Sequence, residues 1–148
     1  MIAPRVQTEH KLTAIHPIFL VHDVVKTAEY YRDMLGFTFN RYWGEPPCFC
    51  IVWRDSVEIF LKGPECPGQE LVVRPNRSHS DAWDVYIRVT DADAMCAELR
   101  GKGVKIVREP ENTVYEMREF EIEDINGYAI CFAHDTSGPN APGVVARE

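Results

Sequence analysis

The sequence contains an internal repeat, which limits the chain to folds built from two similar units. The segment FLVHDVVKTAEYYRDMLGF (19–37) is echoed by IRVTDADAMCAELRGKGVK (87–105), with Asp23 and Asp91 in register. The segment SVEIFL (56–61) is echoed in the same way by GYAICF (127–132). Repeats of this size indicate that each unit buries its apolar side by packing against the other. The 148 residues are enough for two such units in one domain.

The first unit has the hydrophobic pattern of a strand, a helix and three more strands. Residues 24–35 are predicted to be helical because apolar side chains recur at helical spacing, at Val24, Ala28, Tyr31 and Leu35. Asp23 is placed to cap the start of this helix, and Gly36 is placed to end it. Strands separated by turn-forming sequences are predicted over residues 14–21, 37–42, 49–53 and 57–61.

The second unit repeats this order. Asp91 is predicted to cap a helix over residues 92–100, and Asn126 followed by Gly127 is a strong β-hairpin signal. Strands are predicted over residues 84–89, 104–107, 115–123 and 128–133. The chain is therefore expected to hold two βαβββ modules, over residues 14–62 and 82–134. The remaining parts are an N-terminal tail, a linker rich in Pro and Gly, and a C-terminal tail, over residues 1–13, 63–81 and 135–148.

Composition and charge argue against several classes of function. Acidic residues (23) outnumber basic ones (16), giving a net charge of −7, and no long run of like charges occurs. Nucleic acid is therefore not an expected partner. No apolar run approaches the roughly 20 residues of a membrane-spanning helix, and the first residues lack an export signal. The odd number of cysteines, five, then favours reduced thiols. We expect a cytoplasmic protein that does not bind membranes.

Two blocks of sequence resemble a known superfamily. VHDVVKTAEYYRDMLGF resembles the opening signature of the vicinal oxygen chelate superfamily, and EMREFEIEDINGYAICF resembles its closing signature. The resemblance covers about residues 14–134. This superfamily includes glyoxalase I, extradiol dioxygenases, fosfomycin-resistance enzymes and bleomycin-resistance proteins. The resemblance implies an α+β fold of two βαβββ modules, with paired, cup-shaped mixed sheets and helices on the outer face. It also implies a homodimer.

The resemblance also identifies the positions at which metal-dependent members carry their ligands. The first-strand histidine lies seven residues before the helix-capping Asp, which corresponds to His16 in the first module and to Asp84 in the second. The last-strand glutamates correspond to Phe60 and Cys131, neither of which is a carboxylate. Glu58 would reach such a position only if the repeat register were shifted by two residues. A mixed set of this kind suits a divalent cation poorly. No metal or other cofactor is expected, and any metal would have to use His16, Glu58 and Asp84.

Strand alternation separates side chains that pack on the helices from side chains that face the cup. Apolar residues fall consistently on the helix side, which leaves a polar set on the other side. The expected ligand-binding residues are His16, Glu58, Phe60, Lys62, Asp84, Tyr86, Arg88 and Cys131. As an alternative, the four charged residues of this set form solvated ion pairs at the rim of the cup: Glu58, Lys62, Asp84 and Arg88. His16 can likewise be a hydrogen-bonded histidine without a ligand role.

Two further groups of side chains allow more than one interpretation. Aromatic residues could stack on a planar ligand, or could belong to the core or a dimer interface: Tyr42, Trp43, Phe49, Trp53 and Trp83. Arg118, Glu119 and Glu121 lie in the closing signature. Their strand could attract a cationic ligand, or it could be a solvated edge.

The function favoured by these observations is a metal-independent small-molecule-binding protein resembling bleomycin-resistance proteins, with a ligand held in a cup between the modules. The alternative is a metal-dependent lyase or isomerase of the glyoxalase/dioxygenase type. A third possibility is a regulatory module without turnover. No catalytic residue is assigned, because no nucleophile–base pair or phosphate-binding loop is present. In a metal-free enzyme, acid/base catalysis would fall to His16, Glu58 or Asp84, with Tyr86 assisting.

Overall fold

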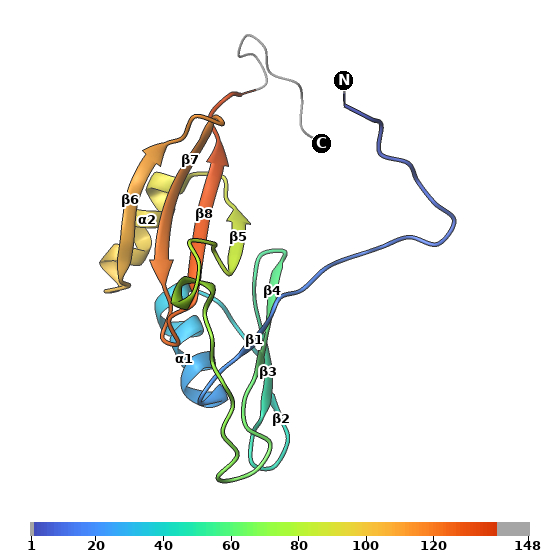
Figure 1. Cartoon of the computed structure of the whole chain (residues 1–148), viewed down its shortest axis with the longest axis vertical. Coiled ribbons are helices and arrows are strands. Elements are labelled where there is room, and N and C mark those ends of the chain that lie inside the picture. The colour runs from blue at the N-terminus through green and yellow to red at the C-terminus, as the bar shows by residue number, and fades with distance from the viewer. Residues whose placement is uncertain (1, 139–148) are drawn as a thin grey trace.

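The protein consists of two four-stranded sheets, each covered on one face by a helix, in a computed structural model that describes residues 2–138 (Figure 1). The first module contains β1 (Ile18–Leu20), α1 (Val24–Leu35), β2 (Tyr42–Trp43), β3 (Phe49–Arg54) and β4 (Val57–Lys62). The second contains β5 (Val85–Arg88), α2 (Ala92–Gly101), β6 (Ile106–Asn112), β7 (Met117–Glu123) and β8 (Ala129–Asp135). The strand orders are β1-β4-β3-β2 and β5-β8-β7-β6. The predicted α+β fold with two βαβββ modules is confirmed.

The register of the sheets preserves the sequence repeat. Phe19 of β1 lies beside Leu61 of β4 in a parallel pair, and the repeat-related Ile87 of β5 lies beside Phe132 of β8. The alignment of SVEIFL with GYAICF therefore holds in three dimensions. Phe60 and Cys131 occupy equivalent positions, and Glu58 is equivalent to Ala129.

Both helices begin where the sequence predicts. Asp23 accepts a hydrogen bond from the Lys26 N–H, and Asp91 accepts one from the Ala94 N–H, each at 3.0 Å. Helix α1 ends at Gly36, whose φ of 74° is left-handed and suits glycine. The predicted apolar side of α1 is buried against the sheet.

Three predicted strands differ in the structure. The strand predicted over residues 14–21 shortens to the three residues of β1, which follow Pro17 directly; proline cannot donate to the ladder. Residues 37–42 contribute only an isolated bridge between Thr38 and Trp53 before β2 begins. The strand predicted over residues 104–107 begins later and continues to Asn112. Strand β6 lies at a sheet edge, where polar residues and Pro110 are tolerated.

The helix-facing side of each sheet forms the core. Phe19 of β1 and Val21 directly after it are buried, whereas Ile18 and Leu20 are 62% and 39% exposed. Strand β4 follows the same alternation, with Ile59 fully buried and its neighbours half-buried. The predicted assignment of apolar residues to the helix side is confirmed.

Each module reaches the helix of the other through a hairpin. Arg54, at the end of β3, donates to both carboxylate oxygens of Glu98 on α2, at 2.7 and 2.9 Å. In the opposite direction, Asp124 in the β7–β8 turn accepts a hydrogen bond from the Tyr31 hydroxyl of α1 at 2.6 Å. Asp124 also accepts from the backbone N–H groups of Asn126 and Tyr128, at 2.8 and 2.9 Å. These contacts join the modules.

The segments outside the modules have little regular structure. The linker contains one short 3-10 helix, η1 (Asn76–Ser78), and residues 2–13 extend away from the body of the protein (Figure 1). The predicted C-terminal tail over residues 135–148 begins at the last residue of β8, and residues 139–148 lie outside the described residues. Within residues 2–138, neither helix is long and apolar enough to cross a membrane.

The buried Asp124 makes stability depend on pH. Burial raises the pKa of Asp124 to about 6, although the hydrogen bonds from Tyr31, Tyr128 and Asn126 lower it. An unfolded Asp has a pKa near 3.9, so the folded protein holds this proton more strongly than the unfolded chain. The resulting stabilisation is complete below about pH 4 and is lost as the pH rises through about 6.

We expect Asp124→Asn to remove this dependence, because an amide does not ionise. Relative to the unaltered protein, the variant should gain up to about 3 kcal/mol of unfolding free energy between about pH 4 and pH 7. Urea denaturation at several pH values measures this difference. Asp81→Asn, at an exposed linker position, is the control and should follow the unaltered protein. The prediction would be contradicted if Asp124→Asn and the unaltered protein differed in unfolding free energy by the same amount at about pH 4 and at about pH 7.

Candidate functional site

The face of each sheet opposite its helix is the candidate site. We define the module-one face as the side chains of Ile18, Leu20, Phe49, Ile51, Trp53, Glu58, Phe60 and Lys62, which alternate with buried core residues. We define the module-two face as the equivalent side chains of Tyr86, Arg88, Glu119, Glu121, Ala129, Cys131 and Ala133. The two faces occupy matching places in the repeat and differ sharply in chemistry.

The module-one face is aromatic and open. The ring of His16, just before β1, stacks on Phe60 with a centroid distance of 4.9 Å. Phe49 meets Phe60 edge-on at 5.6 Å, and Trp43 meets Phe49 in the same way at 5.6 Å. These rings are only half-buried. Large apolar side chains left partly exposed in one place are typical of a binding surface.

Two charged residues lie on this open face. Lys62 forms an ion pair with Glu65 at 2.8 Å. Glu58 lies opposite Trp53 in the β3–β4 ladder, and its side chain makes no hydrogen bond or ion pair with any residue from 2 to 138. It lines a hollow of about 530 Å³ together with Asn40, Arg41, Trp43, Ile51 and Trp53. The Glu58 carboxylate is thus free to meet a ligand.

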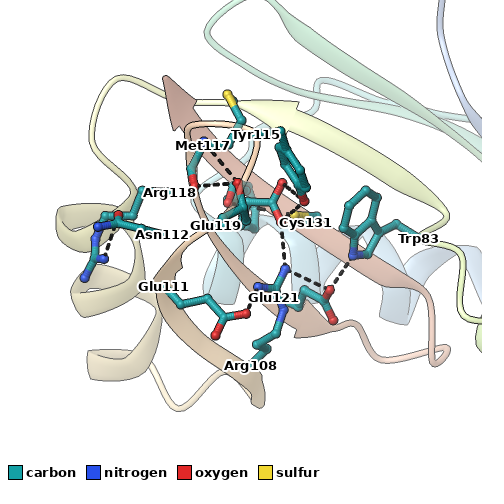
Figure 2. Close-up of polar contacts among 12 residues, drawn as sticks. Trp83, Arg108, Glu111, Asn112, Tyr115, Met117, Arg118, Glu119, Glu121 and Cys131 are labelled. Atoms are coloured by element: carbon teal, nitrogen blue, oxygen red, sulfur yellow. Dashed lines mark hydrogen bonds and ion pairs between the residues drawn. The ribbon is translucent and has the colours of Figure 1, made fainter. Parts of the chain in front are cut away.

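The module-two face holds a closed network around Glu119 (Figure 2). The Glu119 side chain is only 1% exposed. It accepts hydrogen bonds from the hydroxyls of Tyr86 and Tyr115 at 2.7 Å, and from Arg108 at 2.9 Å. Burial, together with the hydrogen bond to Glu119, raises the pKa of Tyr86, so this hydroxyl remains a donor.

Glu121 extends the same network toward the linker. Its side chain is 6% exposed and pairs with Arg77 at 3.0 Å and with Arg108 at 3.1 Å. The indole N–H of Trp83 donates to the same carboxylate (Figure 2). No buried side-chain nitrogen or oxygen in the described part of the chain lacks a hydrogen-bond partner. The network therefore satisfies itself, as buried polar groups require.

Cys131 lies under this network and is not activated. Burial, with the negative charge of Glu119 nearby, raises the pKa of the Cys131 thiol to about 12. The thiol therefore stays protonated, whereas a nucleophilic cysteine requires the thiolate.

The structure divides the eight predicted ligand-binding residues into two groups and two single residues. His16, Glu58, Phe60 and Lys62 lie together at the module-one face, and Tyr86 and Cys131 belong to the module-two network. Asp84 uses its two carboxylate oxygens to accept from the backbone N–H groups of Asn76 and Ala129, at 2.9 and 2.8 Å. Arg88 is half exposed and lies 4.0 Å from Asp135.

The interpretation of β7 as a solvated edge is wrong for two of the three charged residues on which it was based, Arg118, Glu119 and Glu121. Glu119 and Glu121 are buried, and only Arg118 points outward, where it pairs with Asp93 at 2.7 Å. Alternation with the core residues Phe120 and Ile122 places both glutamates on the face opposite the helix, but it does not show that this face is covered. Nothing in the sequence links them to their partners, because Arg77 comes from the linker, Arg108 from the neighbouring strand β6 and Tyr115 from the β6–β7 turn.

The residues at the superfamily's metal positions do not fit a metal ion. Phe60 offers no ligand atom, and both oxygens of Asp84 already accept backbone hydrogen bonds. Within the described range 2–138, no three His, Cys, Asp or Glu side chains gather into a group that could hold a metal ion. The set of His16, Glu58 and Asp84 therefore forms no such group in this chain.

Comparison with known families decides the classification. The family model described as glyoxalase/bleomycin resistance protein/dioxygenase superfamily matches residues 13–132. The chain belongs to this superfamily. Its members share a fold and differ in chemistry, so membership leaves the activity open. No curated protein sequence matches the chain.

Several solved structures share the fold at low sequence identity. A glyoxalase/bleomycin resistance protein/dioxygenase from Nocardioides has a TM-score of 0.65 and 18% identity, over 94% of this chain and 93% of that one. TioX from Micromonospora sp. ML1 has a TM-score of 0.65 and 13% identity, covering 83% and 98% of the two chains. A glyoxalase-related enzyme from Clostridium phytofermentans has a TM-score of 0.69 and 13% identity, covering 87% and 99%.

We expect Arg108→Met to destabilise the protein by about 3 kcal/mol or more, because it leaves two buried carboxylates without a shared cation. Arg100→Met is the matched control, since Arg100 forms an exposed ion pair with Glu109 and its loss should change little. Urea denaturation of both variants measures the effect. Equal stability of the two variants would show that the network does not hold the module-two face together.

Proposed function

We propose that the protein binds a small organic molecule with a flat aromatic group on the module-one face, without a metal ion, as a binding protein of the bleomycin-resistance type. The observation that carries this proposal is the contrast between the two faces. The module-two face is filled by its own hydrogen-bonded network, whereas the aromatic rings of the module-one face are only half-buried and the Glu58 carboxylate has no hydrogen bond or ion pair within residues 2–138.

The chemistry of the module-one face supports a flat ligand. Trp43, Phe49, Trp53 and Phe60 offer ring faces and edges, and aromatic pairs gain energy beyond the area they bury. Arg41 already lies over the Trp43 ring at 4.3 Å, which shows that this ring accepts a cation on its face. A ligand that carries a positive charge beside its ring would also pair with Glu58.

The homodimer expected from the resemblance remains part of this proposal. A second copy could cover part of the module-one face, and the exposed side chains of Ile2, Val6, Leu12 and Ile15 lie on the segment that leads into β1. Light scattering, which gives the molar mass in solution, tests the dimer directly. A monomeric mass at all concentrations would exclude it.

The binding proposal predicts a different response to two dyes of similar shape. 9-Aminoacridine is cationic near neutral pH, whereas acridine is uncharged. Trp53→Ala should weaken both dyes about tenfold or more, because both lose a stacking partner. Glu58→Gln should weaken only 9-aminoacridine, by about fivefold, since a partly exposed ion pair contributes roughly 1 kcal/mol.

Titration calorimetry measures both dyes. Glu29→Gln, at an exposed position on α1, is the matched control and should leave both affinities unchanged. If neither dye binds the unaltered protein, or if Trp53→Ala binds them equally well, the module-one face is not the binding site.

The absence of a metal requirement predicts that no ion is retained. The protein would be incubated separately with Fe(II), Mn(II), Ni(II) and Zn(II), desalted, and analysed for metal by mass spectrometry. We expect substoichiometric amounts of each ion, because the superfamily's ligand positions hold Phe60, Cys131 and an occupied Asp84. One ion per chain, lost on His16→Ala, would instead support the metal-dependent lyase or isomerase.

A further inference from the structure

A cavity of about 640 Å³ lies between the two modules, among the core residues on the helix side of the sheets. It is therefore separate from the module-one face. Its apolar wall is formed by Leu35, Phe37, Val57, Ile87, Met95 and Phe132. Polar groups stand at its edge, among them Arg54, Ser56, Thr90 and Glu98. This size and this mixture of an apolar wall with a few polar groups are typical of small-molecule sites.

The repeat explains why a cavity is present at this junction between the modules. Tyr128, at the start of β8, stacks on Phe19 of β1 with a centroid distance of 4.2 Å and is buried. The residues at the equivalent positions of the other hairpin and strand are Val57 and Ile87, and both line the cavity. The cavity thus lies where smaller aliphatic side chains replace a stacked aromatic pair.

The buried Tyr128 also indicates which polar contact is available in the cavity, which is the repeat-related position. Its hydroxyl donates to the backbone carbonyl of Leu20 on β1. Leu20 corresponds to Arg88 in the repeat, and the next residues, Val21 and Val89, donate their N–H groups to β4 and to Ala133 of β8, at 2.9 and 2.8 Å. Because backbone groups alternate along a strand, the Arg88 carbonyl faces the outer edge of β5, as the Leu20 carbonyl faces that of β1.

We propose that this inter-module cavity binds a phenol, with the aromatic ring beside Val57 and Ile87 and the hydroxyl donating to the Arg88 carbonyl. The ligand takes the place that the Tyr128 side chain fills in the other half of the repeat. The cavity is larger than one ring, so it accepts substituents on the ring as well. This site does not depend on the binding proposed for the module-one face.

The probe for the experiment is p-cresol, which has the structure of a tyrosine side chain. Titration followed by NMR should show saturable binding with a Kd of about 1 mM or tighter. Toluene, which lacks the hydroxyl, should bind at least threefold more weakly. Val57→Tyr supplies the missing ring covalently, and should abolish p-cresol binding without lowering the melting temperature.

Val107→Tyr is the matched control, because Val107 is on β6, 44% exposed and outside the cavity wall. It should bind p-cresol as the unaltered protein does. Nuclear Overhauser effects from the p-cresol ring to the methyl groups of Val57, Ile87 and Met95 in the unaltered protein give a second readout that needs no variant. These nuclear Overhauser effects, together with loss of p-cresol binding in folded Val57→Tyr, would support the proposal. If Val57→Tyr fails to fold, the nuclear Overhauser effects in the unaltered protein decide.

Three results would overturn the proposal. The first is no saturable binding of p-cresol to the unaltered protein, and the second is undiminished binding to folded Val57→Tyr. The third is loss of binding on Trp53→Ala, which would place p-cresol on the module-one face. Trp53→Ala also distinguishes the two proposals. If the dyes fail to bind at the module-one face, the test of p-cresol binding in the inter-module cavity is unaffected.

Discussion

The buried carboxylate of Asp124 connects the two modules, and the arrangement of both sheets depends on this connection. It receives the Tyr31 hydroxyl from α1 and two backbone N–H groups from its own turn, so the β7–β8 hairpin is fixed against the helix of the first module. The reciprocal contact, from Arg54 to Glu98, is a charged pair nearer the surface. One junction is therefore closely packed around an aromatic residue, and the other leaves a cavity.

The same scaffold presents two faces of opposite chemistry. At equivalent positions on the middle strands, the first module has Phe49 and Ile51, and the second has Glu119 and Glu121. The buried glutamates require arginine and hydroxyl partners, and these partners fill the space above the sheet. The aromatic residues require none, and their rings remain half-buried. The two modules thus share strand order and register, while the second fills its own face with a hydrogen-bonded network.

Much of the fold could be predicted from local signals. Asp23, Gly36 and the apolar spacing between them define α1 to the residue, because capping and helical periodicity act within a few residues. The predicted bounds of the edge strands were less accurate than those of the helices. Strand β6 contains charged residues and Pro110, and nothing local shows that these residues lie on an edge strand, where such composition is tolerated.

The sequence alone determined the two-module architecture, the helix caps, the side of each strand that packs in the core and the superfamily. These follow from periodicity and from residues close together in the chain. Only the tertiary structure decided that Asp84 binds backbone N–H groups, that Glu119 is buried beneath Arg108, and that the Glu58 side chain has no partner within residues 2–138. Each of these depends on partners from distant segments, whose position is set by the packing of the modules and leaves no local pattern. The cavity beside Val57 belongs to the same class, because an empty volume is a property of the assembled fold.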